Sequence, residues 1–143
     1  MPSAQWYTRG SYEVTSGGTS LTSSTIKALV VTNSYVFSSG HNVVADITNE
    51  VTGGGYARQT LASKTVTEDD GNLEAYFDCD TLTFSNLTAS NMNAVIMFRD
   101  TGNDATAPLL CYCPLASEQT RAAQDLVVTV PANGWGAASV AIV

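Results

Sequence analysis

Short runs of β-branched and aromatic residues recur about every ten residues along this chain, and clusters of turn-forming residues separate them. This spacing constrains the fold most, because each run suits a short strand and few intervals leave room for a helix. Regularly spaced short strands are typical of a sandwich or a barrel. We therefore predict an all-β fold, an antiparallel β-sandwich that is jelly-roll-like and contains one short helical turn.

Two of the runs are apolar on both faces and should be central strands. The run Thr25–Thr32 becomes continuously apolar after Lys27, and Ala94–Phe98 is apolar throughout. Such runs suit strands that are covered on both sides. Val43–Ile47 has apolar residues at helical spacing over one turn, and only Glu118–Gln124 offers room for a helix of ordinary length.

Turn chemistry predicts a hairpin in the middle of the chain. Glu68–Asn72 is rich in turn-forming residues, and after it Leu73, Ala75 and Phe77 alternate with polar positions. This alternation predicts a half-buried strand. Gly53–Gly55 is the strongest break in the chain, and we expect it to require glycine, which permits a positive φ and close backbone approach.

The same signals divide the chain into two parts. Residues 1–24 lack strand periodicity and contain the Gly- and Ser-rich link Ser16–Ser20, so we expect an irregular N-terminal arm. Residues 25–143 should form the sandwich domain. Its C-terminal part should contain a third strong strand, Leu126–Val130, and a short terminal strand, Val140–Val143.

The charge of the chain argues against two classes of partner. The 143 residues include 6 Lys and Arg against 13 Asp and Glu, which is a formal net charge of −7. The cationic contacts that drive nucleic-acid binding are missing, and an anionic membrane surface would not attract the chain. No apolar run approaches the roughly 20 residues of a membrane span. Met1-Pro2-Ser3 opens no secretion signal, so we expect a protein made in a reducing cytoplasm.

The three cysteines are best interpreted as buried thiols. Cys111 and Cys113 flank one residue of an expected strand and so share a face. A pair between Cys79 and one of them is the alternative. We expect no metal site, because only His41 could join these cysteines and their spacing is not that of thiolate zinc sites.

No constellation of residues indicates catalysis. Asp100-Thr101-Gly102 has the sequence of a dimeric aspartic-protease motif, but Arg99 precedes it and a turn-like stretch follows, so a surface hairpin turn is the favoured interpretation. His41 has no recognisable nucleophile beside it. We expect no enzymatic activity, no catalytic residues and no cofactor.

The candidate interface residues lie outside the strongest strands. Aromatic residues in Gly-rich or polar segments mark interfaces when they are exposed. Local packing under a loop is the alternative for each of them. The candidates are Trp6, Tyr7, Tyr56, Arg58 and Trp135.

Several stretches, in order and spacing from about residue 25 to residue 113, together resemble a family of small structural proteins of tailed phages, the auxiliary head proteins. The series as a whole carries the resemblance. The stretches are Thr25–Val31, Tyr35–His41, Asp46–Ile47, Gly53–Leu61, Lys64–Thr67, Phe77–Asp78, Leu82–Thr88, Ala94–Gly102 and Pro108–Leu110.

This resemblance implies a capsid decoration or cement protein that binds the outer surface of the phage head and stabilises it. The implied partners are the major capsid protein and further copies of the chain, as a homotrimer. The implied location is the exterior of the virion, after assembly in the host cytoplasm. Two alternatives stay open: a tail or fibre-attachment component of the virion, and a carbohydrate-binding sandwich that uses Trp6 and Trp135 as sugar platforms.

Overall fold

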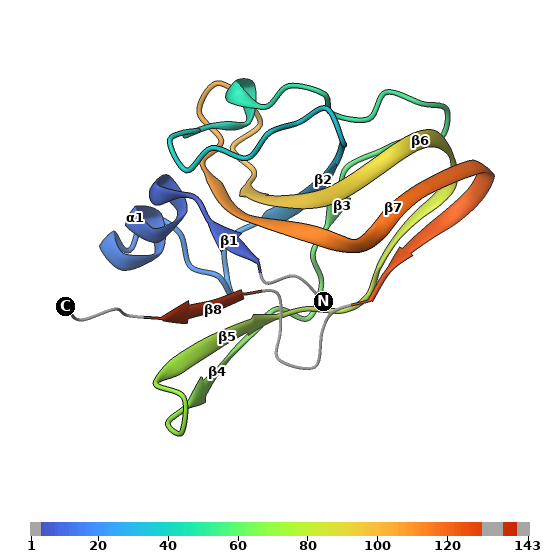
Figure 1. Cartoon of the computed structure of the whole chain (residues 1–143). Coiled ribbons are helices and arrows are strands. Elements are labelled where there is room, and N and C mark those ends of the chain that lie inside the picture. The colour runs from blue at the N-terminus through green and yellow to red at the C-terminus, as the bar shows by residue number, and fades with distance from the viewer. Residues whose placement is uncertain (1–3, 130–135, 140–143) are drawn as a thin grey trace.

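Over the residues that the structure describes, the strands form two antiparallel sheets, with one α-helix and one 3-10 turn outside them (Figure 1). The computed structural model describes residues 4–129 and 136–139, so the expected strand Val140–Val143 lies outside the described residues. In chain order the elements are β1 (Gln5–Trp6), α1 (Thr8–Ser16), β2 (Ile26–Thr32), η1 (Val44–Asp46), β3 (Gln59–Thr60), β4 (Thr65–Asp69), β5 (Glu74–Asp78), β6 (Leu82–Arg99), β7 (Leu109–Val128) and β8 (Gly136–Ser139).

The larger sheet has the strand order β1-β7-β6-β2-β3, and the smaller sheet has the order β4-β5-β8. Every pairing between these strands is antiparallel. The predicted all-β, antiparallel sandwich is therefore confirmed, and η1 confirms the short helical turn. The strand order does not by itself establish jelly-roll connections.

Strands β2 and β6 are central and covered on both faces, as their apolar sequences predict. Ala28 to Val31 and Ala94 to Met97 are completely buried. One set of alternate residues, which includes Val30 and Met97, belongs to one hydrophobic cluster. The other set, which includes Leu29 and Ile96, belongs to a second cluster on the opposite face.

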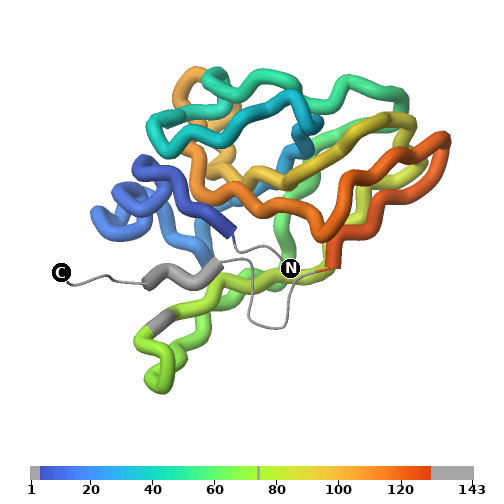
Figure 2. The backbone as a smooth tube through the Cα atoms, viewed as in Figure 1, coloured from blue at the N-terminus to red at the C-terminus, as the bar shows by residue number. Residues whose placement is uncertain are grey.

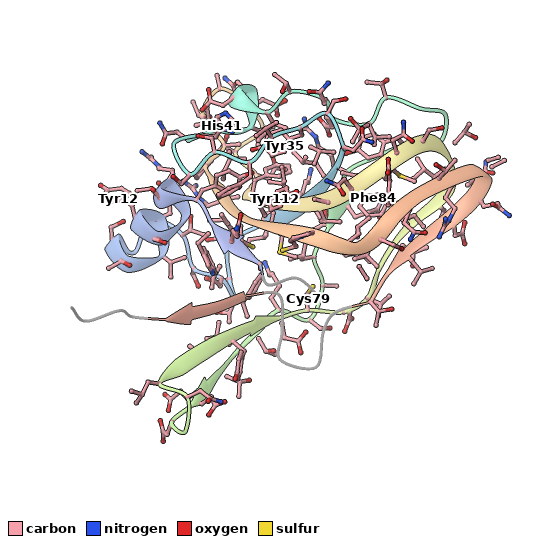
Figure 3. All side chains as sticks on the ribbon, in the orientation of Figure 1. Tyr12, Tyr35, His41, Cys79, Phe84 and Tyr112 are labelled. Atoms are coloured by element: carbon pink, nitrogen blue, oxygen red, sulfur yellow. The ribbon has the colours of Figure 1, made fainter. Side chains whose placement is uncertain are left out.

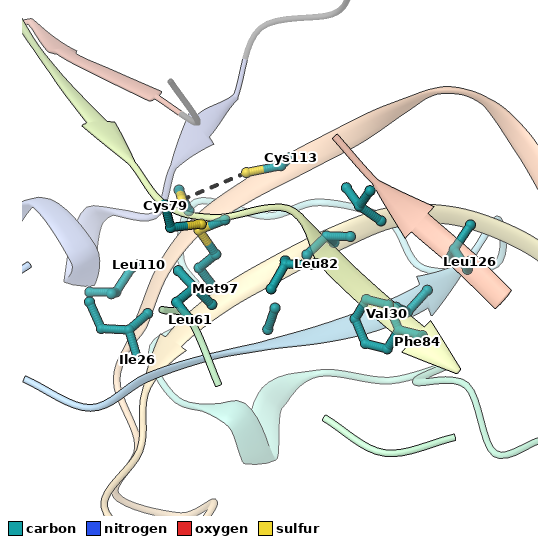
Figure 4. Packing of buried hydrophobic residues seen from close by; sticks show 14 of the residues in the cluster. Ile26, Val30, Leu61, Cys79, Leu82, Phe84, Met97, Leu110, Cys113 and Leu126 are labelled. Carbon is teal, nitrogen blue, oxygen red and sulfur yellow. Dashed lines mark hydrogen bonds between the residues drawn. The ribbon is translucent and has the colours of Figure 1, made fainter. Parts of the chain in front are cut away.

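The cover of the first face comes from the far ends of β6 and β7. These strands of 18 and 20 residues bend sharply near their middles (Figures 1 and 2). Their pairing shifts register repeatedly there, and Asn86, Asn91 and Ala123 adopt positive φ angles. Beyond the bend, Phe84 and Leu126 return to the core beside Val30 (Figure 4). Bulges of this kind let a strand curve over its own sheet.

The helix considered for Glu118–Gln124 is absent, because this stretch is the bent part of β7 and pairs with β6. The pairing contacts of a long hairpin override the weak helical preference of this sequence.

The prediction of an irregular N-terminal arm is wrong for the described part of residues 1–24. Strand β1 pairs with β7, and α1 follows it and ends at Gly17, which has a φ of +82°. The Gly-rich stretch is thus a helix terminus with glycine in its usual left-handed role. The helix lacks the apolar stripe by which an amphipathic helix is recognised in a sequence, because its buried residues are Gly10 and Glu13.

Glu13 connects α1 to the sheet through charge. Its carboxylate accepts hydrogen bonds from Arg9 Nε at 3.0 Å and Thr19 Oγ1 at 3.1 Å, and Arg99 Nη2 on β6 lies 3.5 Å away. The helix also approaches the sheet closely, because a Cβ atom on Gly10 would lie 2.2 Å from the carbonyl oxygen of Leu110. Paired charges of this kind make burial of a carboxylate tolerable.

The Gly53–Gly55 loop packs its backbone against β6. A Cβ atom on Gly55 would lie 2.1 Å from the Asn86 carbonyl oxygen, and Gly55 has a φ of +76°. The Thr88 N–H donates to the Gly54 carbonyl at 2.8 Å. The predicted need for glycine is therefore confirmed at Gly55, where both the backbone angle and the close approach exclude a side chain.

We expect Ile96→Ala to lower the free energy of unfolding by about 2–5 kcal/mol, because it opens a cavity between two covered layers. The matched control is Val127→Ala on β7, a side chain that is 53% exposed, which should change stability by less than about 0.5 kcal/mol. Chemical denaturation measures both. Equal effects of the two changes would contradict the assignment of β6 as a doubly covered strand.

We expect Gly55→Val to destabilise the protein by about 1–3 kcal/mol or more, since a β-branched residue at positive φ is strained and would also meet the Asn86 carbonyl. Gly54→Val is the control, because a Cβ atom there meets no atom within 4 Å and its φ is not positive. A thermal melt of each variant compares them. Similar midpoints for the two would show that the loop does not depend on glycine.

Candidate docking surface

The aromatic candidates near the N-terminus are not free surface. Tyr7 is completely buried, and its hydroxyl oxygen lies 2.8 Å from that of Tyr35 in a hydrogen bond. The expectation that Tyr7 is exposed is wrong, because β1 and α1 fix it against the sheet. Trp6 is half-buried, and its indole N–H finds no acceptor among the described residues. Trp135 lies outside the described residues.

Tyr56 holds the loop after the glycines against the core. Its hydroxyl donates to Glu50 Oε2 at 2.7 Å and accepts from the Val30 N–H at 3.0 Å. Its ring stacks on Phe84 with centroids 6.2 Å apart. Burial and the neighbouring Glu50 carboxylate raise the pKa of the Tyr56 hydroxyl, so it stays protonated and keeps its role as a donor.

Arg58 clamps two carboxylates from different loops. It donates to Glu50 from Nε at 2.8 Å and from Nη2 at 2.7 Å, and to Asp104 from Nη1 at 2.8 Å and Nη2 at 3.0 Å. Its guanidinium carbon lies 5.3 Å from the centroid of the Phe98 ring. These pairings raise the pKa of Arg58 and occupy its donors, so its observed role is internal.

Strands β4 and β5 form a hairpin, which we call the hairpin arm (residues 65–78). Its tip projects away from the larger sheet, and β8 lies along β5 (Figure 1). The side chains of β4 are exposed on both faces from Thr65 to Glu68, and Val66 is 45% exposed. Leu73 at the tip is 82% exposed, whereas Phe77 at the base is buried and anchors the arm to the core.

The sequence predicted the hairpin but not its exposure. Phe77 confirms the half-buried strand at its base, but Leu73 does not lie on that face, because it precedes β5 with a φ of +56°. The missed signal is the composition of β4. Apart from Val66 this strand has no large apolar residue, so neither of its faces has much to bury.

Two motifs considered for catalysis have structural roles. Asp100-Thr101-Gly102 forms the predicted turn, in which the Gly102 N–H donates to Asp100 Oδ1 at 2.9 Å. Asp100 Oδ2 pairs with Lys27 Nζ at 2.9 Å. His41 lies in a loop, where its Nδ1 is 2.8 Å from the hydroxyl of Tyr35 (Figure 3).

The three cysteines are buried, as predicted, and Figure 4 shows Cys79 and Cys113 among the core residues. The Sγ atoms of Cys111 and Cys113 are 3.8 Å apart, which is a thiol contact and not a disulfide bond. This contact and burial raise the pKa of the Cys113 thiol. A protonated, buried thiol is a poor nucleophile and a poor metal ligand.

We expect acid to weaken the Arg58 clamp. Hydrogen bonds from Arg58 hold the pKa of Asp104 below its ordinary value, so this carboxylate stabilises the folded state above its unfolded pKa of about 3.9. The contribution is lost as the pH falls through the lower folded value. Denaturation from about pH 6 to about pH 2 should therefore show a smaller acid-dependent loss of stability for Asp104→Asn than for the wild type.

The control is Asp70→Asn, which removes an exposed carboxylate at the tip of the arm and leaves the Arg58 clamp unchanged. Identical pH profiles for Asp104→Asn and the wild type would show that the clamp does not contribute to folding stability.

The described part of the chain holds no group of three or more His, Cys, Asp or Glu residues that could bind a metal ion. Nor does it contain a helix that is long and apolar enough to span a bilayer. Comparisons of the chain with protein-family models, with curated proteins and with solved structures found no match.

Proposed function

We propose that this chain is a structural protein of a tailed-phage virion, a decoration or cement protein that docks on the outer surface of the head and stabilises it. The observation that carries the proposal is the hairpin arm, which extends from a well-packed sandwich and keeps both faces of β4 in solvent. The sequence resemblance to auxiliary head proteins supplies the identity of the partner, the major capsid protein.

The arm supports docking because one of its strands is held in place and the other is left uncovered. Strand β5 pairs with β8 from Glu74 to Phe77, and Phe77 is buried in the core, whereas β4 pairs only with β5 among the described residues. Val66, which pairs with Phe77, and Leu73 at the tip expose apolar surface that a docking partner would cover. Docking would convert this exposed surface into interface, and stable interfaces bury about 800 Å² on each partner.

The charge of the chain supports the outer surface of the head over the inner one. A net charge of −7 would repel packaged DNA, whereas it is compatible with a capsid exterior. We propose a homotrimer at the threefold positions of the shell, assembled in the host cytoplasm, since linked copies increase weak docking through effective concentration.

We expect capsids stripped of this protein to rupture at a lower temperature than complete capsids, and we expect added wild-type protein to restore the rupture temperature of complete capsids. The double variant Val66→Ser/Leu73→Ser should fail to restore this temperature, because both exposed apolar side chains of the arm become polar. The readout is the temperature at which packaged DNA becomes accessible to a dye.

The matched control is Val36→Ser/Val127→Ser, which changes two side chains that are exposed elsewhere, by 78% and 53% respectively. This variant should restore capsids as the wild type does. Wild-type protein that binds no capsid at about 1 μM would refute the cement proposal. Immunogold labelling of the tail with an unlabelled head would establish the tail component instead.

A further inference from the structure

Strand β4 is the open edge of the smaller sheet. It pairs with β5, and no other strand among the described residues pairs with it. It is also the longest terminal strand of either sheet, with 5 residues against 2 in β1, 2 in β3 and 4 in β8. At about 3.4 Å per residue it presents roughly 17 Å of backbone to a neighbour.

This edge lacks most of the usual protection against strand pairing. Its register with β5 runs without a bulge from the Thr65–Asp78 pair to the Asp69–Glu74 pair. Natural edge strands are commonly blocked by a bulge, a proline or charged side chains, lysine above all. Strand β4 has no proline or lysine, and its two charges are both acidic and lie at its end, in Glu68 and Asp69. It begins with three β-branched residues, Thr65 to Thr67, which favour extended backbone.

The surroundings of the edge carry negative charge. Glu68 and Asp70 are exposed, and the stretch from Thr65 to Asp78 contains no Lys, Arg or His. Asp69 accepts hydrogen bonds from Tyr76 Oη at 2.6 Å and from Asn72 Nδ2 at 2.9 Å, which lower its pKa and keep it ionised. The nearest cation in sequence is Lys64, whose ammonium group donates a hydrogen bond to the Ser24 carbonyl.

We infer that β4 accepts an extended strand of the docking partner, and that this strand places lysine or arginine beside Glu68 and Asp70. The inference rests on the proposed function for the identity of the partner. Main-chain pairing would supply affinity, as in other cases of strand addition, and the charges would supply selectivity. A second copy of the chain fits less well, because it would bring the same acidic residues to the edge.

The test uses the full-length protein and two synthetic peptides as probes, one that alternates lysine with valine and one that alternates glutamate with valine. We expect the lysine peptide to shift the NMR amide signals of residues 65–69. The glutamate peptide should bind at least about tenfold more weakly. Raising the salt from about 0.05 M to about 0.5 M should weaken the lysine complex, because salt screens the charges.

The decisive variant is Glu68→Lys/Asp70→Lys, which changes two exposed side chains and should reverse the preference between the peptides. Glu118→Lys, a change of an exposed side chain on β7, is the charge control on the sandwich body and should leave the preference unchanged. Equal binding of both peptides, signal shifts outside the hairpin arm, or wild-type dimers that pair through β4 would each overturn the inference.

The two proposals fail in distinguishable ways. If the wild type and the Glu68→Lys/Asp70→Lys variant stabilise capsids equally well, the strand-addition inference is wrong and the cement function stands. If the wild type binds the lysine peptide along β4 but does not stabilise capsids, the cement function is wrong and strand addition stands.

Discussion

The structure depends on covering the completely buried segments of two central strands, β2 and β6, on both faces. Residues Ala28 to Val31 and Ala94 to Met97 present apolar side chains up and down from the sheet, so a single layer of cover would leave one face in water. The bend of β6 and β7 supplies one layer, because it returns Phe84 and Leu126 to the core. The segment between β2 and β3 supplies the other, through Tyr35 and Val44.

Irregular segments must then be attached to this core, and the protein attaches them with charged side chains. Glu13 joins α1 to Arg99 at the end of β6, and Arg58 joins Glu50 to Asp104. Arg58 can hold two loops at once because a guanidinium presents several donors in a fixed plane. The low charge content, only 13% of the residues, is thus partly committed to internal pairs.

The exposure of the hairpin arm follows from where the apolar residues lie in the sequence. The apolar residues of the chain are concentrated in β2, β6 and β7, and β4 has little left to bury. Strand β5 is held by β8 and by the buried Phe77, which leaves β4 as an extended, acidic element on a rigid body, an arrangement that suits docking onto another surface. The burial of β2 and β6 in the core and the exposure of β4 in the arm therefore have the same cause, which is the uneven distribution of apolar residues along the chain.

Local sequence was sufficient to predict the all-β class, the central strands, the hairpin turn at Glu68–Asn72 and the glycine requirement at Gly55. Each of these depends on side-chain periodicity or backbone angles over a few neighbouring residues. The tertiary structure alone decided the helix at Thr8–Ser16, the burial of Tyr7, the internal role of Arg58 and the exposure of β4. These features depend on contacts between distant segments, such as Arg99 with Glu13 and Asp104 with Arg58, and no local pattern records which distant segment will come near.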